Sequence, residues 1–258
     1  MMKCTFLGTG TSMGVPVAGG FGLDKIVNDP RNERYRCSVW LETEETSVVI
    51  DTGPEFRLQT IRSNVKKIDL VLITHEHMDH IAGLDDLRSF NYVQNSDIPL
   101  YTNQAAANSI RHRFNYMFGE NKYPGSTSVD IHVMDEPVQF QDLHITPLHY
   151  NHGLIDVQGY RINNFSYMTD VKSIPDETKE KVVGSDVLVL SGLRWEPEHP
   201  THLSIPEAVD IANELKIPKT YLIHMNSYVD HAESNKKLPD HVRLAYDMLE
   251  ITIPSKDL

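Results

Sequence analysis

The stretch LVLITHEHMDHIAG, residues 70–83, decides which fold the sequence predicts. An apolar run over residues 70–73 changes abruptly into five ionisable side chains: His75, Glu76, His77, Asp79 and His80. A short, unbroken run of Leu, Val and Ile indicates a buried strand. Ionisable groups beside a buried strand cost desolvation free energy unless something binds them. The stretch therefore predicts a metal site at the end of a strand.

The same pattern recurs along the chain, because a polar, metal-capable residue follows several other apolar strands. Strand ends are rigid, and functional side chains tend to collect on the loops that they project. We therefore expect these residues to converge. They are Asp51 after SVVI, His152 after ITPLHYN, Asp170 after SYMT and His224 after TYLI.

The spacing within residues 75–80 allows this segment to serve two metal ions. His75 and His77 are two residues apart, so they point the same way in extended chain. Asp79 and His80 follow a turn and can face a second point nearby. Imidazole and carboxylate without thiolate suit Zn, Mn, Fe or Ni. The helical zinc signature H-E-x-x-H is not matched, because Asp79 stands where the second His would be.

Strands and helices alternate throughout the chain, which predicts one α/β domain over residues 1–258. The predicted strands are rich in Val, Ile, Tyr and Phe and are bounded by turn residues. The predicted helices carry start signals such as Pro54, Asn103 and Ser204. Strands are expected at 3–8, 37–42, 47–53, 69–74, 98–102, 143–148, 159–163, 165–170, 186–191 and 220–224, and helices at 54–64, 103–114 and 204–216.

Composition narrows the class of protein. The formal net charge of −12 counts against long nucleic acid as a substrate, though not against a small phosphorylated one. The two cysteines, Cys4 and Cys37, are expected to be buried thiols of a cytoplasmic protein. No apolar run has the length of a membrane span. Nothing in the sequence defines an oligomeric state, and a homodimer is one arrangement that it permits.

The sequence resembles the metallo-β-lactamase superfamily, because THEHMDH matches its H-x-H-x-D-H motif. The remaining pieces follow in the family's order. The chain is most similar to the branch that contains phosphoribosyl cyclic-phosphate phosphodiesterase. The resemblance implies a four-layer αββα sandwich. The supporting motifs are IDTGP, NHG, YMTD and LIHM for the superfamily, and LGTGTSMGVP, DPRNERYRCS, DTGPEFRLQ, GLDDLR, GYRI and HPTHLS for the branch.

The resemblance also implies a role for each candidate residue. One divalent metal, Zn or Mn, would be held by His75, His77 and His152, and the other by Asp79, His80 and His224. Asp170 would bridge the two ions, and Asp51 would orient ligands from behind them. His149 is a rival to His152, which is preferred because it occupies the NHG position. Asp79 and His202 would be the catalytic residues, with His202 assisting the leaving group.

The implied reaction is hydrolysis of a small cyclic phosphate or nucleotide-like phosphodiester by a metal-bridging hydroxide. Arg194 and Arg57 are candidates to contact phosphate, and solvated or ion-paired surface arginine is the equally good alternative. For Arg36 a structural ion pair is the safer prediction. Five further histidines are expected to be ordinary surface or core residues: His112, His132, His144, His199 and His241.

The loop after GVP departs from the family pattern. Relatives often carry cysteines there, and a His three residues beyond the last active-site ligand, which together hold a structural zinc. Here no cysteine lies between Cys4 and Cys37, and Ser227 occupies the His position. We expect no structural zinc, and a loop packed by side chains.

The competing functions are a tRNA 3′-processing nuclease, a thioester or lactam hydrolase, and a binding protein that has lost catalysis.

Overall fold

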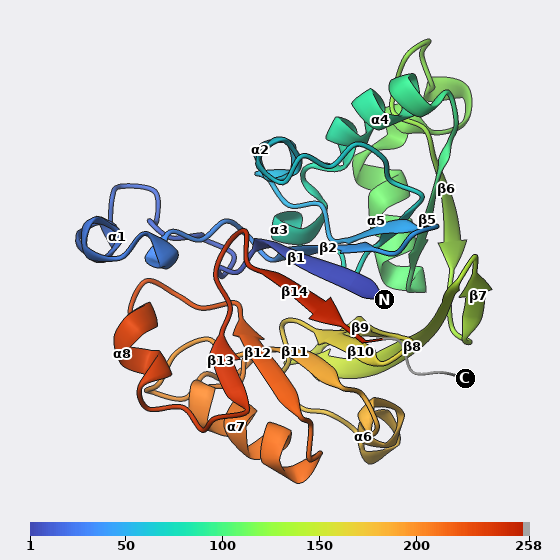
Figure 1. Ribbon diagram of the computed structural model, residues 1–258. Coiled ribbons are helices and arrows are strands. Elements are labelled where there is room, and N and C mark those ends of the chain that lie inside the picture. Colours follow the sequence, from blue (N-terminus) through green and yellow to red (C-terminus); the bar gives the residue numbers. More distant parts are fainter. Residues whose placement is uncertain (255–258) are drawn as a thin grey trace.

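The computed structural model describes residues 1–254, and its backbone forms two seven-stranded mixed sheets that pack face to face (Figure 1). The first sheet contains the N-terminal strands and the last strand of the chain. In spatial order it consists of β14 (Glu250–Ile253), β1 (Met2–Gly8), β2 (Ser38–Glu42), β3 (Ser47–Ile50), β4 (Leu70–Leu72), β5 (Ile98–Thr102) and β6 (Val129–Val133).

The second sheet is built from the C-terminal half of the chain. It runs parallel from β10 to β13 and antiparallel from β7 to β10. In spatial order it consists of β13 (Val242–Leu244), β12 (Lys219–Ile223), β11 (Val187–Ser191), β10 (Phe165–Met168), β9 (Ile155–Ile162), β8 (Leu143–His152) and β7 (Val138–Phe140).

Helices cover the outer face of each sheet, as the upper and lower halves of Figure 1 show. On the first sheet lie α2 (Phe56–Arg62), α3 (Met78–Ile81), α4 (Leu87–Gln94) and α5 (Gln104–Arg113). On the second lie α6 (Asp176–Val182), α7 (Ile205–Glu214) and α8 (His231–Asn235). Helix α1 (Leu23–Asn28) projects from the body, and four 3-10 turns complete the set: η1 (Pro30–Asn32), η2 (Leu84–Asp86), η3 (Asn115–Met117) and η4 (Gly119–Asn121).

The side-chain alternation of the strands explains why the molecule has four layers. In and just after β4, Leu70 and Leu72 join the core between the sheets, whereas Val71 and Ile73 join the core under the helices. All four side chains are fully buried. Burying such a side chain stabilises the fold by about 1.5–3 kcal/mol, so a strand buried on both faces contributes to two cores at once. The predicted αββα sandwich is confirmed.

The predicted helix starts are also confirmed where a capping residue marked them. Ser204 and Glu207 form a capping box at the start of α7. The side chain of Asn103 accepts a hydrogen bond from Ala106 N at 2.8 Å and begins α5. Both cysteines are buried free thiols, as predicted. None of the described helices is both long and apolar enough to cross a bilayer.

Candidate metal centre

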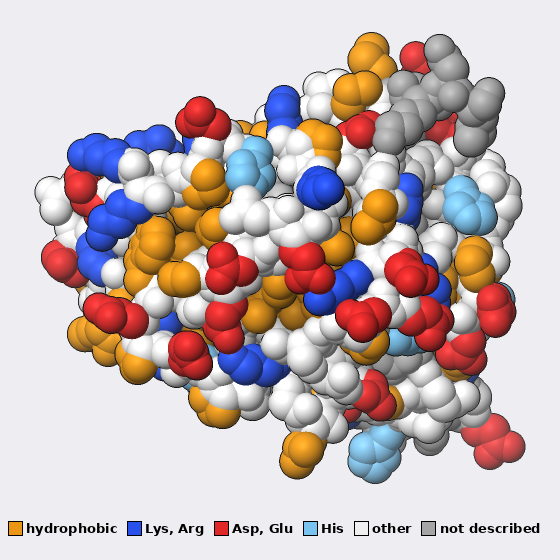
Figure 2. All heavy atoms as spheres, turned by 90° about the horizontal axis from the view of Figure 1, so that it is seen from below, with side chains coloured by type: hydrophobic (Ala, Val, Ile, Leu, Met, Phe, Trp, Pro, Cys, Tyr) orange, Lys and Arg blue, Asp and Glu red, His pale blue; other side chains and the backbone are white. Residues whose placement is uncertain are grey.

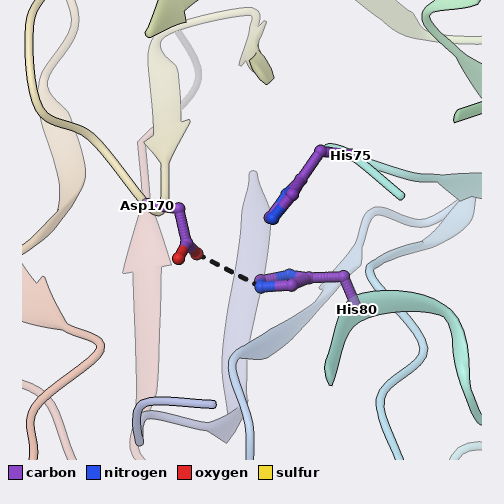
Figure 3. Close-up of side chains that lie close together, drawn as sticks. All are labelled: His75, His80 and Asp170. Atoms are coloured by element: carbon purple, nitrogen blue, oxygen red, sulfur yellow. Dashed lines mark ion pairs between the residues drawn. The ribbon is translucent and has the colours of Figure 1, made fainter. Parts of the chain in front are cut away.

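Strand ends from both sheets meet at one edge of the sandwich. Asp51 follows β3 and residues 75–80 follow β4 in the first sheet. His152 ends β8, Asp170 lies just after β10 and His224 follows β12 in the second sheet. The sheets face each other here, so side chains from separate parts of the chain converge. Figure 3 shows His75, His80 and Asp170 pointing toward one another.

Asp170 lies at the centre of this cluster. Its Oδ2 is 3.2 Å from His80 Nε2, and its Oδ1 is 3.1 Å from His224 Nε2. His80 Nε2 is also 3.2 Å from Asp79 Oδ2. One carboxylate thus faces a histidine from each sheet. A carboxylate oxygen of Asp170 also lies within 4.8 Å of ligand atoms of His75 and of His152, as expected of a ligand shared between two metal ions.

Three overlapping groups of side chains bring their ligand atoms close enough to hold a metal ion. Within each group the atoms lie within 4.8 Å of one another. His77 adjoins the first group, because its Nδ1 is 2.9 Å from His75 Nε2. The groups are His75, His80 and Asp170; Asp79, His80 and His224; and His152, Asp170 and His202.

Hydrogen bonds behind the cluster orient the rings. Asp51 Oδ2 lies 2.7 Å from His80 Nδ1, and both Asp51 oxygens accept from the Thr74 hydroxyl. His152 Nδ1 lies 2.6 Å from the carbonyl of Thr201 and donates to it. Because Nδ1 of each ring is held from behind, Nε2 is the nitrogen available to the centre.

The buried charges of the cluster are coupled to one another. Burial acts to raise the pKa of Asp170, but the neighbouring His224 and His80 outweigh burial and hold this pKa well below its usual value. Burial acts to lower the pKa of His80, but Asp79 and Asp51 outweigh it and raise this pKa well above the usual one. In the protein without metal, a proton on His80 therefore compensates the ionised carboxylates.

The residues fit a pair of divalent cations. The Nε2 atoms of His80 and His224 are buried and lie 3.2 and 3.1 Å from Asp170 oxygens, but within residues 1–254 neither contact has the geometry of a hydrogen bond. A buried nitrogen with no donor or acceptor partner is costly unless a ligand or ion takes its lone pair. Three carboxylates and several imidazoles, with no thiolate among them, match the preference of zinc or manganese.

The backbone is strained where three of these residues leave their strands. The φ angles of Asp51, Asp170 and His224 are 63°, 54° and 63°. This left-handed region costs a non-glycine residue about 1–3 kcal/mol, and it persists only where the surrounding structure imposes it. The strained backbone thus lowers the stability of the fold while it directs these side chains toward the centre.

His152, and not His149, belongs to the cluster. Residues 148, 150 and 152 of β8 are buried, whereas His149 points to the opposite face and is exposed. Alternation along the strand therefore separates the two candidates. The roles of the individual ligands remain predictions.

His202 lies beside the cluster, on the loop before α7. Its Nδ1 is 3.6 Å from Asp170 Oδ1, and its ring packs between His152 and His224 at centroid distances of 4.3 and 4.8 Å. Burial and the charge of His224 lower the pKa of His202 to about 3, so the ring is neutral before substrate binds. Geometry alone would also allow His202 to be a ligand, and its catalytic role stays a prediction.

Arg194 and Arg57, the two predicted phosphate contacts, lie in different parts of the molecule. Arg194 donates to the carbonyls of Pro197 and Glu198, at 2.8 and 3.4 Å. Arg57 lines an outer groove between α2 and α4 with a volume near 1330 Å³. Both arginines remain predicted phosphate contacts. Arg113, which the sequence did not single out, reaches Met78 Sδ at 3.7 Å, beside the ligand segment.

The structural ion pair expected for Arg36 is confirmed, because its guanidinium pairs with Glu55 and also donates to Ser12 O at 3.0 Å. Arg34 is a buried cation that donates to Thr9 Oγ1 and to the carbonyl of Ala245, both at 2.8 Å. Both arginines hold the loops on either side of the cluster.

The 15–36 loop is fastened by side chains, as expected. Lys25 Nζ donates to Ser227 O at 2.7 Å, and Phe21 packs edge-on against Tyr228 at 5.6 Å. Asn32 accepts from His231 N at 2.8 Å. A Cβ on Gly22 would lie only 3.0 Å from Ser227 Cβ, so the loop packs closely against Ser227. The absence of a structural zinc remains a prediction.

Sequence reasoning missed two residues of the centre. Thr201 binds His152 through its carbonyl, and His199 packs against His202 with ring centroids 5.0 Å apart. The signal available was their place in HPTHLS, beside the predicted catalytic His202.

The comparisons with known proteins agree with this geometry. A family profile described as "Beta-lactamase superfamily domain" matches residues 46–225. A crystal structure of "a New Diphosphatase from the PhnP Family" is 36% identical, covers 98% of each chain and has a TM-score of 0.90. The zinc-bound PqqB of Methylobacterium extorquens, 16% identical over 97% of this chain and 100% of its own, shares the fold with a TM-score of 0.80.

Two curated relatives differ in how much of their length is matched. An octanoyltransferase of Porphyromonas gingivalis is 36% identical over all of this chain, which spans only 53% of that protein. A ribonuclease Z of Staphylococcus carnosus is 25% identical over 97% of this chain and 85% of its own length. The family match covers well over half of the chain and includes most of the cluster. This chain therefore belongs to the metallo-β-lactamase superfamily and is a metal-dependent hydrolase.

Proposed function

We propose that this hydrolase cleaves a small phosphodiester or a substituted diphosphate at the His/Asp cluster. The position of Asp170 carries the proposal, because its carboxylate lies within 4.8 Å of ligand atoms from His75 and His152 as well as from His80, and so adjoins residues assigned to both ions. A carboxylate shared between two ligand sets suits the two-metal clamp of phosphoryl hydrolases. The 36% identity to a diphosphatase supports phosphorus as the atom attacked.

Two divalent cations would lower the pKa of a bound water and draw charge from a phosphate oxygen. For one ion we assign His75, His77 and His152, and for the other Asp79, His80 and His224, with Asp170 between them. Asp51 and Thr201 hold two of these rings in the tautomer that ligation needs, through contacts of 2.7 and 2.6 Å. Zinc or manganese suits this set.

Asp79 and His202 are the proposed catalytic side chains. Asp79 has a second carboxylate oxygen with which to accept a hydrogen bond from the attacking water. His202 donates a proton to the leaving oxygen. Since burial and His224 lower the pKa of His202 to about 3, this role requires the negative charge of a bound phosphate to raise that pKa again.

The charge of the protein favours a small substrate. The formal net charge is −12, and Asp and Glu side chains are interspersed with Lys and Arg over the face shown in Figure 2. A long polyanion gains affinity from a continuous basic field, which this mixture does not supply. A small phosphate ester needs only the cations at the centre. Arg194 and Arg57 stay proposed phosphate contacts.

Acyl-thioester hydrolysis is the second candidate, because the relative that matches the whole chain at 36% identity is named an octanoyltransferase. That name belongs to a protein of which this chain spans 53%. A tRNA 3′-processing nuclease is the third, supported by the 25% identity to a ribonuclease Z.

A panel of substrates tests the proposal. The zinc- and manganese-loaded protein is assayed on bis(p-nitrophenyl) phosphate, a nucleoside 2′,3′-cyclic phosphate, a dinucleoside diphosphate, an octanoyl thioester, a β-lactam and a precursor tRNA. The expected result is that kcat/KM is highest for one of the three small phosphorus substrates. A higher kcat/KM for the thioester, the lactam or the tRNA would contradict the proposal. A His77→Ala preparation measures any contaminating activity.

A further inference from the structure

The loop between β11 and α7 is held rigidly against the metal centre. Its stem is closed by a hydrogen bond from Leu193 N to Leu203 O at 2.9 Å. Leu203 N donates to Val171 O at 2.7 Å, which ties the loop to the residue after Asp170. Across the loop, Arg194 Nε donates to Pro197 O at 2.8 Å. Side chains on this loop therefore have fixed positions relative to Asp170.

Thr201 sets the tautomers of two histidines at once. Its carbonyl accepts from His152 Nδ1 at 2.6 Å, while its backbone N–H and its hydroxyl lie 3.3 and 3.2 Å from His199 Nδ1. A backbone N–H can only donate, so His199 Nδ1 is the acceptor. The proton of the neutral ring is then on Nε2. His199 consequently presents an N–H donor on the side of the ring away from Thr201.

The His199 ring lies next to the His202 ring, farther from Asp170 and closer to solvent. His202 Nδ1 is 3.6 Å from Asp170 Oδ1, and the His199 ring lies 5.0 Å from the His202 ring. His199 is partly exposed, whereas Asp170 is 2% exposed. Burial and the nearby Arg194 lower the pKa of His199, which keeps the ring neutral at pH 7. His199 thus offers a hydrogen bond at the mouth of the centre.

We propose that His199 and His202 form a subsite for the leaving group, in which His199 Nε2–H donates to a second oxygen carried by that group. This inference rests on the proposed function, since it takes His202 to face the scissile oxygen. A leaving group with an oxygen acceptor close to the scissile oxygen can reach both rings. Such acceptors occur on the second phosphate of a diphosphate and on the neighbouring hydroxyl of a sugar. A p-nitrophenolate has none near its phenolic oxygen.

Kinetics with matched substrates test the subsite. His199→Ala is compared with wild type on bis(p-nitrophenyl) phosphate, on a dinucleoside diphosphate and on a ribonucleoside 3′,5′-cyclic phosphate, whose 2′-hydroxyl lies beside the 3′ leaving oxygen. We expect KM to rise about 3- to 10-fold, the worth of one hydrogen bond, wherever the leaving group carries the second oxygen. With bis(p-nitrophenyl) phosphate KM should not change. An increase for the diphosphate alone identifies a phosphate-type leaving group, and an increase for the cyclic phosphate alone identifies a hydroxyl.

Two further variants separate a substrate contact from a structural role. His199→Asn keeps an N–H donor and should restore most of the lost affinity. His241→Ala changes a histidine that was predicted to be ordinary, and should leave every KM as in wild type. Elemental analysis should find unchanged metal in His199→Ala. The inference would be overturned if each substrate had the same KM with His199→Ala as with wild type. Loss of metal from His199→Ala would also overturn it.

A binding measurement keeps this test independent of turnover. Methylenediphosphonate has a P–C–P bridge that cannot be hydrolysed, and its binding to the metal-loaded proteins is measured by calorimetry. Weaker binding to His199→Ala, restored in His199→Asn, supports the subsite even if no phosphorus substrate is turned over. Equal binding to wild type and His199→Ala overturns it. Absence of turnover on every phosphorus substrate would contradict the proposed function and not the subsite.

Discussion

The metal centre and the 15–36 loop lie at the same edge of the sandwich but are stabilised in opposite ways. The centre buries carboxylates and imidazoles, and Asp51, His75, His80, Asp170 and His224 are at most 2% exposed. The loop instead leaves apolar side chains in solvent, with Phe21 55% and Val27 84% exposed. The centre therefore needs a cation to complete it, whereas the loop holds its place by contacts that need none.

The backbone makes the same distinction. In the loop, positive φ angles fall on glycines, such as 96° at Gly19 and 95° at Gly22, where they carry no steric cost. In the centre they fall on Asp51, Asp170 and His224, where they do. Of these two regions, only the centre places positive φ angles on residues other than glycine. Changes in the centre should remove metal and activity, and changes in the loop should do neither.

The largest effect is expected from His77→Ala. His77 Nδ1 lies 2.9 Å from His75 Nε2, so the substitution removes one of two adjacent nitrogens aimed at one ion. We predict loss of that metal and of all activity, whatever the leaving group, as measured by elemental analysis and turnover. The control is His149→Ala, an exposed histidine of β8, which should keep both. Full metal content in His77→Ala would remove this residue from the ligand set.

His202→Ala should give the next largest effect and should separate a catalyst from a ligand. We predict that both metals stay bound while turnover of a phosphodiester falls about 10²–10⁴-fold, the usual contribution of general acid catalysis. The loss should shrink with p-nitrophenolate, which leaves without protonation. If His202→Ala loses metal, His202 is a ligand. Full activity on a substrate with a poor leaving group would place the acid elsewhere.

Asp51→Asn tests the support behind the ligands. The carboxylate binds His80 Nδ1 at 2.7 Å and Thr74 N at 2.8 Å. An amide keeps one acceptor but loses the charge that favours the required tautomer of His80. Removing such partners typically lowers metal affinity about 10–100-fold, and we expect a loss in that range from competition with a chelator. Unchanged affinity would mean that Asp51 only fills space.

Lys25→Met should have the smallest effect, because it touches only the loop. It removes the hydrogen bond from Lys25 Nζ to Ser227 O, and we expect about 1 kcal/mol less stability by denaturant unfolding. Metal content and kcat/KM should equal those of wild type. Lys236→Met, on an exposed helix pair with Glu233, is the control and should stay within about 0.5 kcal/mol. Loss of metal from Lys25→Met would contradict this prediction, because it would show that metal binding depends on the loop.

Much of the fold and of the cluster could be predicted from sequence, because both depend on apolar strands that end in polar residues. The runs before Asp51, His75 and Asp170 are buried on both faces, so their composition shows directly in the sequence. Capping residues likewise marked α5 and α7. These signals are local, and each is strong on its own.

Several of the elements that were missed lack such signals. Strands β6, β7, β13 and β14 are short or partly exposed, as in the pattern of one buried residue among four in β14. Helix α1 contains no buried residue and lies inside a glycine-rich loop. Nothing in the sequence showed the left-handed φ angles of Asp51, Asp170 and His224, because tertiary contacts impose them. The contact between Thr201 and His152 joins residues 49 positions apart.

The central claim is that this edge of the molecule holds two metal ions and the neighbouring loop none. The direct measurement is the number of metal equivalents per chain after loading with zinc or manganese, with anomalous scattering to place them. The account predicts two ions about 3.5–4 Å apart, among the His and Asp side chains that surround Asp170. One ion or none in the centre, or a third ion beside Gly20 and Ser227, would contradict it.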